Sequence, residues 1–221
     1  MLNIIITIIV LMGILSSCEP ICDPIPGTPS NVPLGVCHGI KPGRVTWAWE
    51  PNACSWDGKT GRWWNNSNID IKTVSGMFER TLIGITGEKT VSTAWKTLIE
   101  DVNTRFYREP KGRGYKRGDG LVIKVNLNGM LGSYEDNDGN GLSPQFLHSV
   151  LSSIVNVAGI PQEDIAVYDA SRWFVNFLFE PNHASFPRIR FIDNAGQKSR
   201  EKAVFDEFSH SAVVELMRTL V

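Results

Sequence analysis

One stretch of the chain, from Leu121 to Arg172, restricts the fold more than any other. It begins with an apolar run, Leu121 to Asn128, and reaches a second one, Ile165 to Tyr168, through a glycine-rich loop and a segment with helical periodicity. A strand that is apolar at nearly every position is typical of a sheet covered on both faces. Two such strands joined by a helix form a βαβ crossover with parallel strands. The stretch therefore predicts an α/β fold with an open, largely parallel sheet and flanking helices, containing a βαβ unit at 121–172.

The helix that joins the two strands has clear boundary signals. Ser143 is placed to cap its N-terminus, and Pro144 stands at the first helical position. An apolar stripe follows at helical spacing, and Gly159 ends the helix. His148 falls outside the stripe, so we expect its side chain to be exposed.

Two amphipathic helices are expected before this unit. The first begins after Asp70, its N-cap, and ends at Gly87. The second follows from about Thr90. Earlier in the chain, Arg44 to Trp49 alternates large apolar with small residues, which predicts a half-buried strand.

After the βαβ unit the pattern predicts one more strand, Arg188 to Asp193. If the parallel sheet is cut short, Ile189 to Ile192 would be an exposed edge strand.

Length and composition indicate one globular domain with an exported leader. The 221 residues suit a single core, and a net charge of −1 argues against nucleic acid as a general partner. An almost wholly apolar run from Leu2 leads into Leu15-Ser16-Ser17-Cys18, which resembles the lipobox of bacterial lipoproteins. The resemblance implies a signal peptide at 1–17, acylation of Cys18 and attachment to a cell-envelope membrane, outer or inner. The proline-rich residues 18–35 would be the tether, and 36–221 the domain.

Metal and cofactor signals are weak. Asp136, Asp138 and Asn140 match the first half of a calcium loop, but Leu147 stands where such a loop needs a bidentate glutamate. A solvated turn is therefore the first interpretation, and an incomplete Ca²⁺ site the second.

The three cysteines beyond the predicted lipidation site, Cys22, Cys37 and Cys54, fit neither paired zinc ligands nor a ferredoxin-type cluster. We expect no iron–sulfur cluster in this chain. In an exported protein two of them could form a disulfide.

Six polar residues gather where the two predicted strands end: Lys124, Asn126, Asn128, Asp169, Ser171 and Arg172. By the period-two rule, Lys124, Asn126 and Asn128 lie on one side of their strand. In open α/β sheets, ligands bind outside the carboxyl ends of the strands. The pattern predicts a site for a small anionic ligand, with Asn128, Ser171 and Arg172 as ligand-binding residues.

If the site is catalytic, Lys124 would act electrostatically and Asp169 would be a base or metal ligand. Asn126 and Asn128 would be the donors that orient the substrate. The structural alternative is that Asp169 pairs with Arg172 while Lys124 extends to the surface. A rival function is a non-catalytic surface or carbohydrate-binding protein that uses the tryptophan-rich loop from Trp56 to Trp64. The same tryptophans could instead cover one end of the core.

Several separate blocks of the chain resemble exported proteins that carry the uncharacterised domain DUF362. The matching blocks are Gly39–Trp47, Asn52–Gly58, Ile123–Asn128, Ser143–Pro161 and Asp164–Asp169. The resemblance implies an α/β fold and an envelope lipoprotein like those of Bacteroidota, but no established activity. Family members usually continue past the region matching Arg200, so the resemblance also implies an incomplete C-terminus. A truncated copy without function is the third alternative.

Overall fold

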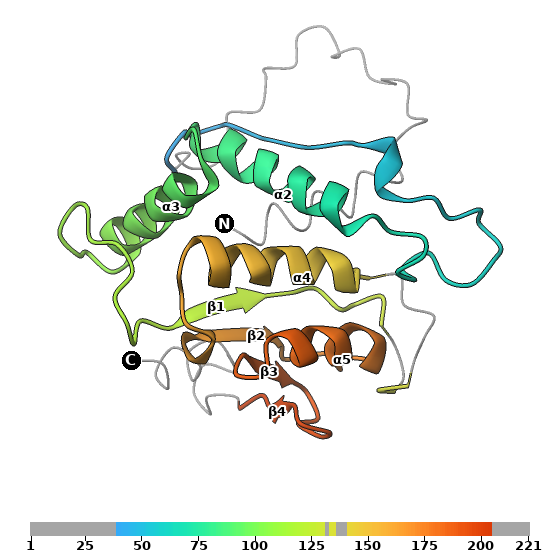
Figure 1. Cartoon of the computed structure of the whole chain (residues 1–221). Helices are drawn as coiled ribbons and strands as arrows, with labels where there is room; N and C mark the ends of the chain where they lie inside the picture. The colour runs from blue at the N-terminus through green and yellow to red at the C-terminus, as the bar shows by residue number, and fades with distance from the viewer. Residues whose placement is uncertain (1–38, 131–132, 136–140, 205–221) are drawn as a thin grey trace, which may run out of the picture.

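The computed structural model describes residues 39–130, 133–135 and 141–204 (Figure 1). Within them the chain forms a four-stranded, all-parallel sheet with helices packed against it, which confirms the predicted α/β fold. The predicted signal peptide, Cys18 and the tether lie outside the described residues, as do Asp136, Asp138 and Asn140 of the predicted calcium loop.

The strands follow one another across the sheet in chain order. They are β1 (Leu121–Lys124), β2 (Ile165–Asp169), β3 (Arg190–Asp193) and β4 (Glu201–Lys202). The register places Lys124 beside Tyr168, and Asp169 beside Asp193. The predicted βαβ unit is therefore present, with both strands parallel and adjacent.

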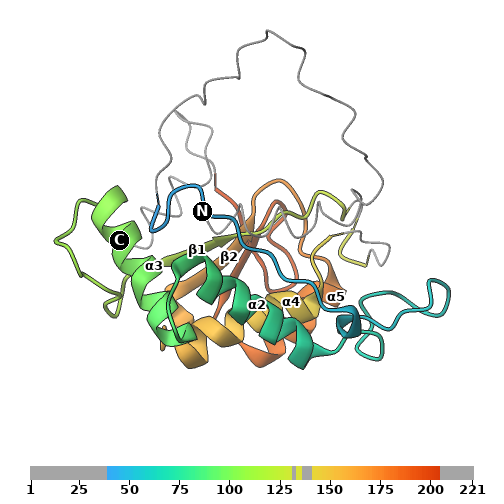
Figure 2. The ribbon, with the colours of Figure 1, turned by 90° about the horizontal axis from the view of Figure 1, so that it is seen from above.

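The helices lie on one side of this sheet (Figure 2). They are α2 (Ile71–Thr86), α3 (Val91–Phe106), α4 (Pro144–Ser152) and α5 (Asn176–Ser185), with short helical turns at Pro51–Ala53 and Gln162–Asp164. Helix α4 continues into a π-helical turn, Ser153–Val157, which no local sequence signal predicts. Helix α5 was also not predicted, because Pro181 lies inside it and proline normally breaks a helix interior.

The predicted helix caps are confirmed. The Asp70 carboxylate accepts from the backbone N–H groups of Lys72 and Thr73 at the start of α2. Thr90 forms a capping box with Thr93 before α3. Ser143 Oγ accepts from Phe146 N, 3.0 Å away, at the start of α4.

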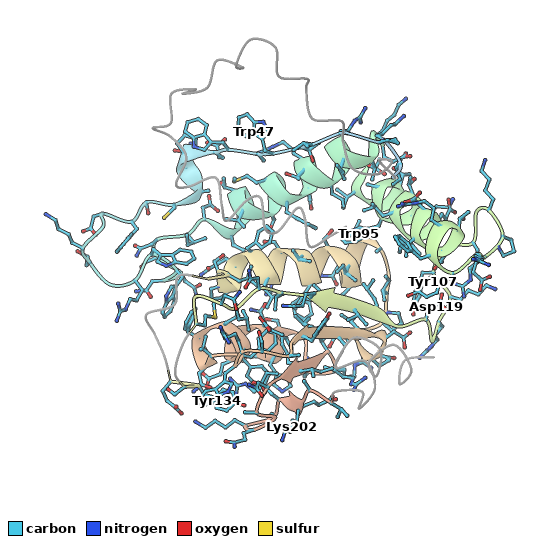
Figure 3. All side chains as sticks on the ribbon, turned by 180° about the vertical axis from the view of Figure 1, so that it is seen from behind. Trp47, Trp95, Tyr107, Asp119, Tyr134 and Lys202 are labelled. Carbon is cyan, nitrogen blue, oxygen red and sulfur yellow. The ribbon has the colours of Figure 1, made fainter. Side chains whose placement is uncertain are left out.

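The predicted strand from Arg44 to Trp49 is wrong. These residues form an extended strap that runs along α2 instead of pairing in the sheet (Figure 1). Thr46 Oγ1 donates to the α2 carbonyl of Thr81 at 3.1 Å, and Arg44 Nη1 donates to that of Gly84 at 2.9 Å. Figure 3 shows Trp47 at the outside of the molecule, above this helix. The period-two alternation is real, but side-chain bonds to a helix replace strand pairing.

The predicted exposed edge from Ile189 to Ile192 is wrong at its end, because the short strand β4 pairs in parallel with Ile192 and Asp193. The charged segment after Arg200 supplies this short strand. Arg200, just before it, is buried. The sheet therefore places β3 in its interior.

The main core fills the space between the sheet and the helices. Ile123, Val125 and Leu127 point into it, while Lys124 is half-buried and Asn126 is exposed, as the alternation predicts. A smaller cluster of Ala166, Tyr168, Ile192 and Ala203 lies on the other face of the sheet.

The prediction that His148 is exposed is wrong, because its side chain is half-buried. Its ring centroid lies 5.2 Å from that of Phe186, and burial lowers its pKa. Phe186 is the C-cap of helix α5, which has no clear sequence signal. Tertiary packing, not the stripe of α4, therefore decides the burial of this histidine.

Candidate functional site

The carboxylate of Asp169 is the centre of the predicted strand-end site. It ends β2, and the residue is only 1% exposed. Its Oδ2 accepts from Leu127 N at 2.8 Å and lies 3.3 Å from Lys124 Nζ. Its Oδ1 accepts from the backbone N and the hydroxyl of Ser171, at 3.0 and 2.8 Å. Asp169 thus ties the loop after β1 to the loop after β2.

The electrostatics of this carboxylate follow from its partners. Burial has the largest single effect and raises the pKa of Asp169, but the hydrogen bonds from Leu127 and Ser171 and the charge of Lys124 outweigh it, so the net pKa is lowered. An ionised carboxylate has about four acceptor positions, and four donors surround this one. The arrangement favours a positioning role for Asp169 over that of a general base.

Lys124 lies at the tip of β1 with its side chain 34% exposed. Its ammonium reaches the Asp169 carboxylate, contacts the carbonyl of Val125 and lies 5.7 Å from the ring centroid of Tyr168. The structure therefore brings Lys124 and Asp169 together, and part of the ammonium's surroundings remains open to solvent.

Asn126 and Asn128 follow on the same side of the chain, and both are exposed. Asn126 Oδ1 accepts from Asn128 N at 3.0 Å, which forms an Asx turn. Among the described residues, the Asn126 Nδ2 group and the Asn128 side chain have no protein partner. The two asparagines shape a turn and still present amide groups to solvent beside Lys124.

Ser171 and Arg172 complete the predicted set. Ser171 is held by Asp169, and Arg172 Nη1 donates to the Ser171 carbonyl at 3.0 Å. In the described part of the chain, Arg172 Nε is buried without a hydrogen-bond partner, and Arg172 makes no ion pair with Asp169. The alternative in which these two residues pair is therefore wrong, because Lys124 takes that place.

Asp193 was missed by sequence reasoning. It is fully buried beside Asp169 at the end of β3. It accepts from Phe174 N at 3.1 Å, from Gly196 N at 2.7 Å and from the hydroxyl of Tyr134 at 3.3 Å. Each terminal aspartate thus binds an N–H of the loop that follows the preceding strand. The available sequence signal was an aspartate at the end of both β2 and β3.

Arg200 was also missed, since it belongs to a charged segment. Its guanidinium carbon lies 3.8 Å from the ring centroid of Phe179 and 4.5 Å from that of Tyr134. It donates to the carbonyl of Phe174 at 2.6 Å and to Asn176 Oδ1 at 2.8 Å. Burial lowers its pKa. Arg200 fixes the start of α5 and is not available to a ligand.

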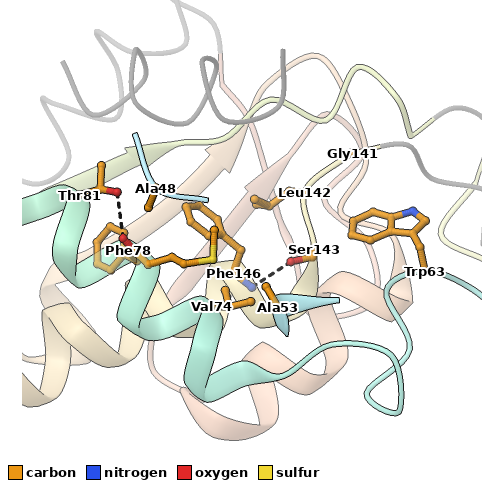
Figure 4. A pocket seen from close by; sticks show the side chains of 11 residues that line it. Ala48, Ala53, Trp63, Val74, Phe78, Thr81, Gly141, Leu142, Ser143 and Phe146 are labelled. Atoms are coloured by element: carbon orange, nitrogen blue, oxygen red, sulfur yellow. Dashed lines mark hydrogen bonds between the residues drawn. The ribbon is translucent and has the colours of Figure 1, made fainter. Parts of the chain in front are cut away.

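An apolar pocket of about 300 Å³ lies elsewhere, between the strap, α2 and the start of α4 (Figure 4). Its lining is Ala48, Ala53, Trp63, Val74, Met77, Phe78, Thr81, Gly141, Leu142, Ser143 and Phe146. The hydroxyl of Ser143 caps α4, and that of Thr81 donates to the Met77 carbonyl at 2.9 Å. None of the predicted strand-end residues lines this pocket.

The tryptophan-rich loop is largely used in packing. Trp64 stacks on Phe177 with ring centroids 4.0 Å apart, and Trp63 lines the apolar pocket. Trp56 Nε1 donates to the carbonyl of Thr60 at 3.0 Å. These contacts agree better with a cover over one end of the core than with a sugar-stacking surface.

Within residues 39–130, 133–135 and 141–204, no cluster of three or more histidine, cysteine or acidic side chains could hold a metal ion. Cys54 is an exposed free thiol. None of the helices in these ranges is both long and apolar enough to cross a bilayer.

Comparisons with protein-family models, with curated proteins and with solved structures found no match. The resemblance to DUF362 proteins therefore stays a prediction, as does the anchor at Cys18.

Proposed function

We propose that this protein is a cell-envelope lipoprotein, acylated at Cys18, whose DUF362-like domain binds a small anionic ligand at the carboxyl ends of β1 and β2. The apolar leader ending in Leu-Ser-Ser-Cys supports the anchor. The all-parallel sheet supports the location of the site, because the loops diverge beyond the strand ends.

One observation carries the ligand proposal. Lys124 is a partly exposed cation, held at a strand tip by a buried carboxylate 3.3 Å away. Asn126 and Asn128, both exposed, offer amide donors on the same side of the chain. Arg172, which is half-buried, adds a second cation on the neighbouring loop. A ligand with a carboxylate or phosphate group is the natural partner of such donors.

The geometry favours binding over acid–base catalysis. Asp169 and Asp193, the two carboxylates at the strand ends, are buried and engaged by several donors each. A general base must reach the proton that it abstracts. In this protein the two aspartates hold the loops that carry the ligand-facing groups.

The test of the ligand site is calorimetric titration with inorganic phosphate, acetate and citrate. The protein would be the chain from position 18 onward carrying Cys18→Ser, which retains every described residue. We expect Lys124→Met to weaken binding of the preferred anion by about tenfold or more, the usual size for a charged hydrogen bond. Lys96→Met is the matched control, because that lysine lies on α3 with its side chain 69% exposed.

Equal affinities of Lys124→Met and the parent chain would refute the site, and so would a lack of binding to all three anions.

The anchor is tested separately. Wild-type protein should partition into the detergent phase of a membrane extract, and Cys18→Ser should not. Identical partitioning of the two forms would exclude acylation at Cys18.

A further inference from the structure

The strap along α2 carries a row of large apolar side chains that are mostly exposed. Val45, Trp47 and Trp49 are 66%, 65% and 72% exposed. The residues between them face the protein: Thr46 bonds to α2, and Ala48 lines the apolar pocket. Alternation along an extended backbone therefore gives the strap one anchored side and one outward apolar side. Exposed apolar rows of this kind mark interaction surfaces.

The composition of the row indicates what it contacts. Its only hydrogen-bonding side-chain groups are the two indole N–H groups, since the polar Thr46 is turned inward. A sugar-binding surface needs polar side chains between its aromatic rings to bind hydroxyl groups, whereas here the charged side chains stand before and after the row. Tryptophan combines a large apolar ring with one donor, the combination that is enriched at the boundary between membrane and water.

Charge at the start of the row agrees with this partner. Arg44, immediately before Val45, and Lys41, three residues earlier, are both exposed. Arg44 keeps its position by donating to the Gly84 carbonyl at 2.9 Å. Cations beside interfacial aromatic rings are attracted to anionic lipid headgroups. At the other end of the row, the Glu50 carboxylate accepts from Asn52 Nδ2 at 3.2 Å.

The position of the strap in the chain supplies the third argument, which rests on the proposed lipid anchor. About 20 residues separate Cys18 from Gly39, the first described residue. A segment of that length spans at most roughly 70 Å when fully extended. An anchor at Cys18 would keep the strap within reach of the bilayer surface at all times.

We infer that Val45, Trp47 and Trp49 form a membrane-docking face, which inserts into the headgroup region of an anionic bilayer and turns α2 toward the membrane. The partner is the lipid surface itself, recognised by interfacial indole rings and by the cations of Lys41 and Arg44.

The experiment measures flotation of the chain from position 18 onward, carrying Cys18→Ser, with vesicles of phosphatidylethanolamine and phosphatidylglycerol in a 3:1 ratio. This form has neither the apolar leader nor an acyl group. We expect the Trp47→Ala/Trp49→Ala variant to lose about tenfold or more of its vesicle partitioning, because two interfacial indole rings are removed. Quenching of tryptophan fluorescence by brominated lipid should fall in the same variant.

The matched control is Phe106→Ala/Tyr107→Ala, which removes two aromatic side chains at the end of α3 that are 66% and 52% exposed. This control should partition like the parent chain. The inference is overturned if the parent chain does not float, or if both double variants lose partitioning equally. It is also overturned if the tryptophan variant loses binding to a glycan array but not to vesicles. Because this protein carries no acyl group, failure here would leave the detergent-phase test of Cys18 unaffected.

Discussion

At the scale of single residues, buried charge is the main feature of this protein. Asp169 is almost fully buried, and an ionised carboxylate in such a place is costly unless its oxygens are hydrogen-bonded. Two backbone N–H groups, one hydroxyl and one ammonium satisfy it. The charge holds together two loops that belong to different strands.

We expect Asp169→Asn to destabilise the protein by about 1–3 kcal/mol, because a neutral amide cannot accept from all four donors and leaves buried N–H groups unsatisfied. Urea unfolding at pH 7 measures this. Glu100→Gln is the control, since its pair with Lys96 is a surface pair on one face of α3, and such pairs contribute at most about 0.5 kcal/mol. Equal midpoints for Asp169→Asn and the parent chain would contradict the role given to this carboxylate.

At the scale of elements, α2 shows how a helix end depends on backbone conformation. Gly87 follows the helix with φ of 77°, and its N–H donates to the Ile83 carbonyl. A side chain at that φ is strained, and a Cβ there would also lie 3.1 Å from Arg44 Nη1. Gly76 lies inside the same helix, where a Cβ would meet only ordinary contact with Arg80.

The two glycines therefore predict opposite effects of the same substitution. Gly87→Ala should lower the free energy of unfolding by about 1 kcal/mol, and Gly76→Ala should raise it by about 0.5–1 kcal/mol. Thermal and urea unfolding of the two variants measure the difference. Shifts of the same sign would show that the end of α2 does not depend on a left-handed residue.

At the scale of the whole molecule, the carboxyl groups of the described residues whose pKa departs from its ordinary value are all shifted downward. Hydrogen bonds from their neighbours lower the pKa values of the exposed carboxyl groups of Asp57, Asp70 and Glu135 and of the half-buried Asp119. The pKa of Asp169 is lowered as well. A carboxyl group with a depressed folded pKa stabilises the fold above its unfolded pKa, and that stability is lost as the pH falls through the folded value.

We expect the free energy of unfolding to fall steeply below about pH 4, the ordinary range of these carboxyl groups. Asp169→Asn should make this acid-dependent loss shallower. Urea unfolding between pH 5 and pH 2.5 gives the comparison. An unchanged slope would mean that the Asp169 carboxylate does not contribute to acid unfolding.

Protonation of His148 adds a loss of stability at higher pH than that of the carboxyl groups. Burial lowers its pKa from the ordinary value of 6.5, so the folded state resists its protonation. Its contribution to stability is present above about pH 6.5 and is lost as the pH falls through the lower folded value. His148→Phe should therefore reduce the loss of stability between pH 7 and pH 5, measured by the same unfolding series. A variant with the parent's pH dependence in that range would contradict the assignment.

The sequence alone determined the elements whose signals are local. Asp70, Thr90, Ser143 and Gly87 define helix ends through bonds to residues a few positions away, so their roles can be read without the fold. The apolar runs of β1 and β2, joined by a helix of adequate length, leave a parallel pair as the natural arrangement. The polar cluster at the strand ends, with Lys124 and Asp169 in contact, also follows from this topology.

Tertiary structure alone decided the features that depend on distant partners. The strap has the alternation of a strand, but it bonds to α2 through Thr46, and pairing in the sheet is a non-local choice. Helix α5 forms around Pro181 because packing overrides a local helix-breaking preference. Arg200 is buried because two aromatic rings and the carbonyl of Phe174, all far away in the sequence, surround its guanidinium. Local patterns report which conformation a segment favours, whereas burial depends on what the rest of the chain places beside it.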